Sequence, residues 1–363
     1  MKICYFGGYD KDYPRTRILM KGLKKNGVEI IECHELQKFL PNKFKLINIP
    51  RFLSLVAKHS KLKDYDAMIV GYPGWYDMPI ARLLTNLRGK PIIFDAFTSM
   101  YETIYTDFPE KRKSLLASFL WKMDKISCEL ANIIILNTNL HSKYFSKEFG
   151  IDIHKFRRVF VGTDDDVFYP RKSNKHDDIF LVYFHGTHIP RHHGIEYILK
   201  AAKILEKQKR IKFRIVGYKQ TDTIIQKFLN GSKLKNIELI EKWIPYEKLP
   251  ILMKDADACL GVFGTSMKTK RVIANKLYEI IAMGKPLIHA DVPAIKEAGI
   301  ENKKNALLCK AGDPKGIVNS IVTLMEDSNL KRKISRNGYK LFKKRFTTRA
   351  IGKDFKKVIE DSL

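Results

Sequence analysis

The sequence predicts an α/β protein built from two doubly wound domains, each with a mostly parallel sheet that helices cover on both faces. One observation is length, because 363 residues are enough for two hydrophobic cores. Another is the alternation of short apolar runs with helical patterns along the chain. This alternation restarts after residue 170, which predicts domains at 1–170 and 171–348 and a last helix over 349–363.

In the first half, short apolar runs that end at turn residues predict strands. These runs are Lys2–Gly7, Val28–Cys33, Ala67–Gly71, Pro91–Ala96, Ile133–Leu136 and Arg158–Val161. Periodic apolar residues predict helices between them at Ile18–Asn26, Asp77–Leu87 and Lys111–Leu130. Ligands of such sheets bind beyond the carboxyl ends of the strands, so one rim is expected to carry Gly7, Gly8, Gly71, Tyr72, Asp95 and Phe97.

The second half repeats the pattern after a polar linker that contains Val161–Pro170. Its predicted strands are Ile179–His185, Lys212–Val216, Ile237–Ile240, Ala258–Val262 and Pro286–Ala290. Its predicted helices are Gly194–Gln208, Asp222–Leu229, Glu247–Lys254, a short helix within Val272–Pro286, Lys315–Asp327, Leu330–Lys344 and Arg349–Leu363. The linker carries three consecutive acids, which favour turns and helix capping over a metal site.

The chain is strongly basic, with 67 Lys and Arg against 39 Asp and Glu and a net charge of +28. Such a field attracts nucleotides, nucleic acid or an anionic membrane surface, although a solvated lysine-rich surface would give the same count. Nucleic acid is not expected, because the sequence shows no basic–aromatic repeat or nucleic-acid motif. The five cysteines lack metal-binding or redox spacing, the start reads as a strand, and no apolar run is long enough to span a membrane. A cytoplasmic location is expected.

The segment Leu36–Lys63 mixes seven Lys and Arg with large apolar residues and has no acidic residue. Part of it fits an amphipathic helix on anionic lipid headgroups. A helix packed on the core with a solvated basic side fits equally well. A peripheral position on the inner face of the cell membrane is therefore one expectation.

The helix within Val272–Pro286 has the residues of an anion site at its start. Asn275 and Lys276 lie where free backbone N–H groups and the helix dipole favour negative charge. Glu279, three residues on, shares a helix face with Lys276 and could accept hydrogen bonds from both ribose hydroxyls. The pattern predicts a nucleotide diphosphate site, although an ordinary helix with favourable charges in its first turn remains open.

The loop His185–Gly194 contains Arg191, which could hold a phosphate oxygen bidentately. Its four histidines have no carboxylate or cysteine at a ligand-like spacing, so substrate contact is favoured over metal binding. Gly7 and Gly8 would let a ligand approach the backbone closely, or could serve only the turn.

Together these halves resemble the glycosyltransferases of GT-B fold, which have two Rossmann-like domains, and most of all the family 4 (group 1) enzymes. The resemblance rests on GGY near the start, VGTDDDVFYP before the linker, HGTHIPRHHGIEYILKAAKIL and NKLYEIIAMGKPLI. It implies that Glu279 binds the ribose, that Trp243–Pro245 border the base, and that Gly7 and Gly8 lie near the diphosphate. It also implies that the last helix crosses back onto the first domain, which would bind the acceptor, while the second binds the donor.

The sequence departs from the family at three places. Arg271 stands where a glutamate usually faces the donor sugar, and Gly186-Thr187 and His193-Gly194 replace the usual Gly-Arg and Lys-Gly. Lys276, Arg191 and Arg271 could restore the missing positive charge. Asp95 stands where many relatives have a histidine, so it could bind the donor sugar or the incoming hydroxyl, or cap a turn.

We therefore expect transfer of a sugar from a nucleotide-diphosphate sugar to an acceptor hydroxyl on a glycan or glycolipid, without metal or another cofactor. Retention of configuration is implied by the resemblance alone. A sugar-nucleotide epimerase and a non-catalytic protein that binds polyanions or membranes are the alternatives. The expected catalytic residues are Asp95, Arg191 and Lys276. The expected donor-binding residues are Gly7, Gly8, Gly186, Thr187, His193, Gly217, Ile244, Arg271, Asn275, Lys276 and Glu279.

Overall fold

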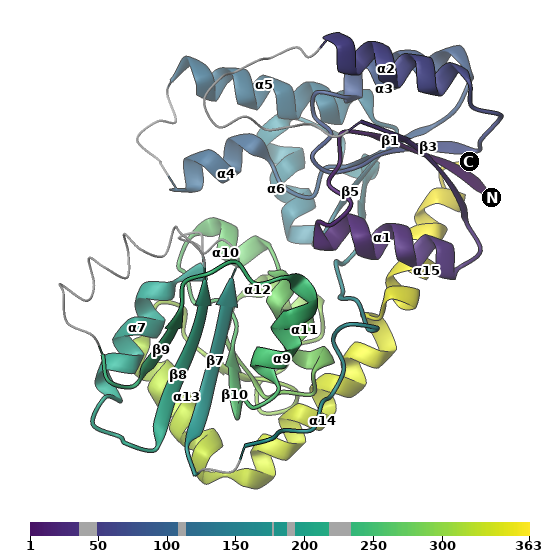
Figure 1. The fold of residues 1–363 in the computed structure, drawn as a ribbon. Coiled ribbons are helices and arrows are strands. Elements are labelled where there is room, and N and C mark those ends of the chain that lie inside the picture. The colour runs from purple at the N-terminus through teal and green to yellow at the C-terminus, as the bar shows by residue number, and fades with distance from the viewer. Residues whose placement is uncertain (36–48, 108–113, 176–177, 187–192, 218–233) are drawn as a thin grey trace. The chain divides into compact units, whose positions relative to one another are not determined.

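A computed structural model describes residues 1–35, 49–107, 114–175, 178–186, 193–217 and 234–363 (Figure 1). The chain forms two compact units, one made of Met1–Val161 with Thr348–Leu363 and the other of Gly162–Thr347. Each unit is built on a six-stranded parallel sheet, which confirms the predicted fold class. The first unit ends at Val161, whereas the sequence placed the boundary after residue 170.

The start of the linker belongs to the second unit because its contacts lie there. The Thr163 amide donates to the Phe346 carbonyl at 3.2 Å. The Thr163 and Tyr246 hydroxyls lie 2.8 Å apart, and the Phe168 ring packs edge-on against Tyr246. These bonds and ring contacts fix the linker on the C-terminal unit.

The N-terminal sheet has the strand order β2-β1-β3-β4-β5-β6. Its strands are β1 (Lys2–Gly7), β2 (Glu29–His34), β3 (Ala67–Val70), β4 (Ile92–Asp95), β5 (Ile133–Leu136) and β6 (Phe156–Arg158). The strands β3, β4 and β5 are apolar throughout apart from Asp95, as expected for a sheet that is covered on both faces. The order reverses between β1 and β3, and ligands of such sheets bind at that point.

Seven helices described in the N-terminal unit cover this sheet: α1 (Pro14–Lys25), α2 (Ile49–Ser60), α3 (Met78–Leu87), α4 (Met100–Asp107), α5 (Leu115–Leu130), α6 (Asn139–Phe149) and α15 (Thr348–Glu360). The C-terminal helix α15 packs against α1 in this unit (Figure 1). Their backbones meet at two glycines, since a Cβ atom on Gly352 would lie 2.1 Å from the Gly22 carbonyl. The end of the chain therefore completes the unit that contains its start.

Helix α2 lies in the segment Leu36–Lys63, for which the sequence allowed either membrane contact or packing on the core. Leu55 is fully buried in the core, and Phe52 and Val56 pack against it. The Arg51 guanidinium is buried in an ion pair with Asp77, with the Nη2 atom 2.6 Å from Oδ1. Residues 49–60 therefore pack one face of a helix on the core, and Arg51 is not a membrane-facing cation. Ile49 and Leu53 of the same helix are exposed, so membrane contact by this helix also stays a prediction. Membrane contact by residues 36–48, which lie outside the described residues, stays a prediction.

The C-terminal sheet has the order β12-β11-β10-β7-β8-β9. Its strands are β7 (Phe180–Gly186), β8 (Ile211–Gly217), β9 (Ile237–Ile240), β10 (Ala258–Leu260), β11 (Leu287–Ala290) and β12 (Leu307–Cys309). The described helices are α7 (Ile195–Ile204), α9 (Leu249–Met253), α10 (Met267–Arg271), α11 (Asn275–Ala282), α12 (Pro293–Glu297), α13 (Pro314–Glu326) and α14 (Ser328–Arg345). Helix α13 packs against α7, and α14 against α11. The strand order reverses between β7 and β10.

Most predicted strands lie within one or two residues of the observed ones, whereas several short elements were missed. The missed elements are α4, α6, α10, α12 and β12. They are short, or polar on much of their surface, so periodicity alone does not mark them. The helix expected at Asp222–Leu229 lies outside the described residues. All five cysteines are buried free thiols.

Candidate functional site

The site is centred on the carboxyl edge of the C-terminal sheet, at the point where strand order reverses. His193, which precedes α7, contacts the segment that follows β10. The Phe263 amide donates to the His193 carbonyl at 2.9 Å. Gly194 has a left-handed φ of +72°, and a Cβ atom there would lie 2.5 Å from the Gly264 nitrogen. A glycine is therefore needed to bring the two segments together.

Lys276 lies in the first turn of α11 and is 4 % exposed. Its Nζ atom lies 3.9 Å from the centroid of the Phe184 ring and 3.3 Å from Nδ1 of His193. Burial lowers the pKa of Lys276 from 10.5 to about 7, although the nearby Glu279 carboxylate acts in the opposite direction. An anion bound beside this amine would favour its charged form.

The start of α11 offers backbone donors beside this lysine. The helix begins at Asn275, and Ala274 at the N-cap position has no side chain that could accept a hydrogen bond from the first turn. The helix dipole also places partial positive charge at this end. An anionic group is therefore the ligand that this end of α11 favours.

Glu279 lies one turn further along α11 and pairs with the histidine at the end of β7. Its Oε2 atom is 2.7 Å from Nε2 of His185, and both side chains are almost fully buried. The same carboxylate contributes to raising the pKa values of Tyr183 and Tyr246, where burial is the main cause. His185 fixes one carboxylate oxygen, and the second oxygen has its own acceptor capacity for a hydroxyl ligand.

A pocket adjoins this cluster at the ends of β7 and β8. Its lining residues are Gly186, Val216, Gly217, Lys242, Trp243, Ile244 and Leu249. The Trp243 side chain is 59 % exposed, which is unusual for a large aromatic residue. The enclosed space is only about 10 Å³, so a planar ligand such as a nucleotide base would rest against the Trp243 and Ile244 side chains at its mouth.

The structure brings two groups of predicted residues together in this unit. Gly186, Gly217 and Ile244 line the pocket. His193 contacts Lys276, and Glu279 follows one turn later on the same helix. Arg271 is the last residue of α10 and is partly buried. Thr187 and Arg191 lie outside the described residues.

Gly7 and Gly8 lie at the end of β1, beside a buried carboxylate. The Gly8 amide donates to Oδ2 of Asp77 at 2.8 Å, and Asp77 is also paired with Arg51. Gly7 has a φ of +114°, and a Cβ atom there would lie 2.6 Å from the same oxygen. The glycines therefore serve an internal turn, and donor contact by them stays a prediction.

Asp95 ends β4 and is fully buried. Nε of Arg15 lies 2.7 Å and 3.0 Å from its two carboxylate oxygens, and Nη1 of Arg15 donates to the Val159 carbonyl. Burial raises the pKa of Asp95 although the arginine opposes that shift. This placement favours a structural ion pair over the expected contact with sugar or acceptor.

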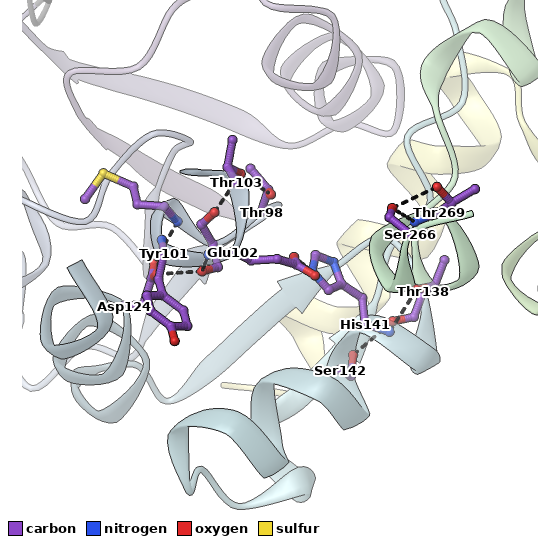
Figure 2. A network of polar contacts seen from close by, with 12 residues as sticks. Thr98, Tyr101, Glu102, Thr103, Asp124, Thr138, His141, Ser142, Ser266 and Thr269 are labelled. Carbon is purple, nitrogen blue, oxygen red and sulfur yellow. Dashed lines mark hydrogen bonds and ion pairs between the residues drawn. The ribbon is translucent and has the colours of Figure 1, made fainter. Parts of the chain in front are cut away.

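A buried polar network at the start of α4 was not predicted from the sequence (Figure 2). The Asp124 carboxylate accepts hydrogen bonds from the Ser99 hydroxyl at 2.6 Å and the Tyr101 amide at 3.0 Å. Burial raises the pKa of Asp124 to about 7. In the same network, Oε2 of Glu102 lies 3.0 Å from Nε2 of His141. The sequence gives one indication of this network, which is the position of Asp124 on the apolar face of the helix that ends at Leu130.

Within the described residues, no group of three His, Cys, Asp or Glu side chains is arranged to hold a metal ion. No helix in the described ranges combines the length and the apolar character needed to cross a bilayer. Metal independence and membrane attachment both stay predictions.

Comparisons with known proteins concern the family and the fold. Residues 166–341 match the family described as "Glycosyl transferases group 1". An uncharacterized glycosyltransferase of Methanocaldococcus jannaschii is 25 % identical over 169 residues, which is 46 % of this chain and 42 % of that protein. This chain therefore matches less than half of that relative's length.

Solved structures resemble the whole chain. A structure of Anabaena HepE in complex with UDP has a TM-score of 0.69 at 13 % identity and covers 99 % of both chains. Sucrose-phosphate synthase of Thermosynechococcus elongatus has a TM-score of 0.76 at 15 % identity over 99 % of this chain and 98 % of that one. At these identities the likeness establishes the fold.

Two parallel α/β units of this kind define the GT-B class of proteins. Within that class, residues 166–341 match the group 1 glycosyltransferases. The resemblance inferred from the sequence motifs is thereby confirmed.

Proposed function

We propose that this chain transfers a sugar from a nucleotide-diphosphate sugar to an acceptor hydroxyl, and that the C-terminal unit binds the donor. One observation carries the proposal: Lys276 and the Glu279–His185 pair lie on α11 and β7, beside a small apolar hollow at which Trp243 is exposed. This arrangement offers a separate contact for each part of a nucleotide diphosphate. The match of residues 166–341 to the group 1 family supports the same reaction.

In this proposal the base rests against Trp243 and Ile244. The ribose hydroxyls donate to Glu279, whose orientation is fixed by the hydrogen bond with His185. The diphosphate lies against the start of α11 and Lys276. Each contact uses a chemical group that already has the matching charge or hydrogen-bonding capacity.

The same contacts account for catalysis. Negative charge grows on the β-phosphate as the bond to the sugar breaks, and a cation with helix N–H groups at that place stabilises the leaving group. Because Lys276 is held by Phe184 and His193 before the donor arrives, it needs little reorganisation. We propose that this positive charge makes a metal ion unnecessary, and that the configuration of the sugar is retained, as the family resemblance implies.

Ligand-dependent thermal stability tests the donor site directly. HepE has been solved with UDP-glucose, so UDP and UDP-glucose are the first ligands to use. A ligand that binds only the folded chain at a hundred times its Kd stabilises it by about 2.7 kcal/mol, which raises the melting temperature. We expect a rise with UDP and UDP-glucose and none with uridine at the same concentration.

In the Lys276→Met variant, most of the rise in melting temperature with UDP and UDP-glucose should be lost. The matched control is Lys285→Met, because Lys285 is also a partly buried lysine of this unit but donates to the Ala256 carbonyl at 3.1 Å. Equal rises in Lys276→Met and the wild type would remove Lys276 from the donor site. No rise with any nucleotide in the wild type would contradict the proposal as a whole.

A further inference from the structure

Three aromatic side chains meet at the carboxyl edge of the N-terminal sheet. Tyr13 follows β1, Tyr72 follows β3, and Phe97 follows β4. The Tyr13 ring centroid lies 5.2 Å from that of Tyr72 and 5.9 Å from that of Phe97, and Tyr72 and Phe97 are 5.2 Å apart. Each of the three is partly exposed. This aromatic cluster (Tyr13, Tyr72 and Phe97) lies where the strand order reverses, the usual ligand-binding place in such a sheet.

Phe97 has an unusual backbone conformation, with a left-handed φ of +46°. Bulky residues rarely adopt this conformation because the Cβ atom crowds the backbone, so the surrounding structure must hold it. Strain of this kind concentrates at sites that bind ligands. A glycine would be free of this strain, yet the chain has a phenylalanine here.

Two buried polar groups hold the chain on either side of Phe97. Before it, Asp95 is fixed by Arg15, whose guanidinium carbon also lies 4.9 Å from the centroid of the Phe97 ring. After it, the Ser99 hydroxyl donates to Asp124 at 2.6 Å. The aromatic cluster is therefore rigid before any ligand arrives, and the ring of Phe97 rests on a buried cation.

The chemistry of the aromatic cluster fits a sugar ring. Aromatic faces attract C–H groups, and a pyranose presents C–H groups on its faces and hydroxyls at its edges. Burial raises the pKa values of Tyr13 and Tyr72, which keeps both hydroxyls protonated and able to donate. An alkyl chain would use the ring faces but leave the two hydroxyls without hydrogen-bond partners.

We propose that the aromatic cluster of Tyr13, Tyr72 and Phe97 binds a pyranose ring of the acceptor, so that the acceptor is a saccharide or a glycoside. The inference rests on the proposed glycosyl transfer, since it names the substrate that receives the sugar. It assigns Phe97 the role of the ring on which the acceptor stacks. Tyr13 and Tyr72 then determine which hydroxyls of that ring can be accommodated.

Saturation-transfer difference NMR on the full chain tests this proposal with defined probes. The probes are methyl α- and β-glucopyranoside, methyl β-galactopyranoside and, as the lipid-like comparison, 1-hexanol. We expect at least one glycoside to receive saturation in the wild type, mainly at its C–H groups, and hexanol to receive little. If no glycoside binds, or if hexanol binds at least as well, the proposal is wrong.

The key variant is Phe97→Gly, which removes the ring and suits the left-handed backbone at this position. We expect the glycoside signal to fall by at least about tenfold, as for loss of a stacked ring, while the thermal unfolding curve stays cooperative. Tyr72→Phe keeps the ring but removes a hydroxyl and should weaken the signal less. Leu87→Ala is the control, because Leu87 is exposed at the far end of α3. A glycoside signal that survives in Phe97→Gly would overturn the proposal.

A parallel titration with UDP separates this inference from the proposed function. Phe97→Gly should bind UDP with the wild-type affinity, because Phe97 belongs to the other unit's sheet. A wild-type chain that binds glycosides through Phe97 but does not bind UDP would keep the aromatic cluster as a sugar site and reject the proposed donor site.

Discussion

The two units share one architecture but treat their charged residues in different ways at the carboxyl edges of the sheets. In the N-terminal unit, Arg15 and Arg51 are buried in ion pairs with Asp95 and Asp77. In the C-terminal unit, Lys276 rests against a phenylalanine ring and a histidine, and its pKa falls to about 7. At the edge of the N-terminal sheet, the buried arginines are already paired with carboxylates. At the edge of the C-terminal sheet, Lys276 has a lowered pKa, and a bound anion would favour its protonated form.

This contrast indicates how one fold can bind two unlike substrates. The edge with satisfied ion pairs presents the aromatic cluster to a neutral ligand. The edge with Lys276 and the start of α11 presents positive charge to an anionic ligand. Five predictions test the contrast, beginning with the largest expected effect.

The largest effect is expected from removal of Arg15, which should lower the stability of the N-terminal unit. The Arg15→Met variant leaves the Asp95 carboxylate buried without its partner, which costs about 3–5 kcal/mol of unfolding free energy. Urea denaturation measures the loss. The control is Arg214→Met, because Arg214 pairs with the half-exposed Glu238 and such surface pairs contribute about 0–1 kcal/mol. If both variants lose a similarly small amount of unfolding free energy, the buried Arg15–Asp95 pair does not stabilise the fold as described.

Glu279→Gln should weaken donor binding in the C-terminal unit. Hydrogen bonds to a charged group contribute about 1.5–3 kcal/mol, so we expect about ten- to hundredfold weaker binding of UDP by calorimetry. With 2′-deoxy-UDP, which lacks one ribose hydroxyl, the difference between wild type and variant should shrink. The surface substitution Glu238→Gln is the control. An unchanged Kd for UDP in Glu279→Gln would show that this carboxylate does not hold the ribose.

The affinity for UDP should fall as pH rises above about 7, because Lys276 loses its proton there. The loss approaches about tenfold per pH unit until the pKa of the complex is reached, since one pKa unit corresponds to 1.36 kcal/mol. The binding of uridine, which has no phosphate, should not follow this pH profile. Lys276→Met should show weak UDP binding with little change over the same range, and a wild-type profile in this variant would assign the titration to another group.

The same shift has a consequence for folding, with a sign that follows from linkage. The pKa of Lys276 is lower in the folded chain than in the unfolded chain, so the unfolded chain binds more protons between pH 7 and 10.5. The contribution of this lysine to the unfolding free energy therefore becomes more favourable as pH rises through that interval. Lys276→Met should remove that part of the pH dependence in urea unfolding curves.

The smallest effect is expected from Trp243→Ala. Stacking of a base on an aromatic side chain contributes about 1–3 kcal/mol, and the exposure of Trp243 favours the lower end, near a fivefold weaker Kd for UDP. Pyrophosphate, which has no base, should bind both proteins equally. Ile251→Ala is the control, because Ile251 is also half exposed and does not line the pocket. A larger loss for pyrophosphate than for UDP would place the base elsewhere.

The sequence predicted the arrangement of residues at the edge of the C-terminal sheet better than that at the edge of the N-terminal sheet, for a physical reason. The charges at the start of α11 are close together in the sequence, so a helical pattern is enough to place Lys276 and Glu279 on one face. The glycines that end β7 and β8 likewise follow apolar runs, and both line the pocket. Local spacing determined these contacts.

The partners of these residues could not be predicted, because they come from distant parts of the chain. His185 lies 94 residues before Glu279, and Arg15 lies 80 residues before Asp95. No local pattern reveals that Asp95 is paired with Arg15 or that the Gly8 amide donates to Asp77. The left-handed backbone of Phe97 is equally hidden, since the residue type argues against that conformation.

The most direct test of the account is a crystal structure of this chain with bound UDP. We predict that the diphosphate lies within hydrogen-bonding distance of Nζ of Lys276 and the start of α11, that the ribose hydroxyls donate to Glu279, and that the base lies beside Trp243. UDP bound at another place, away from Lys276 and Glu279, would contradict the account.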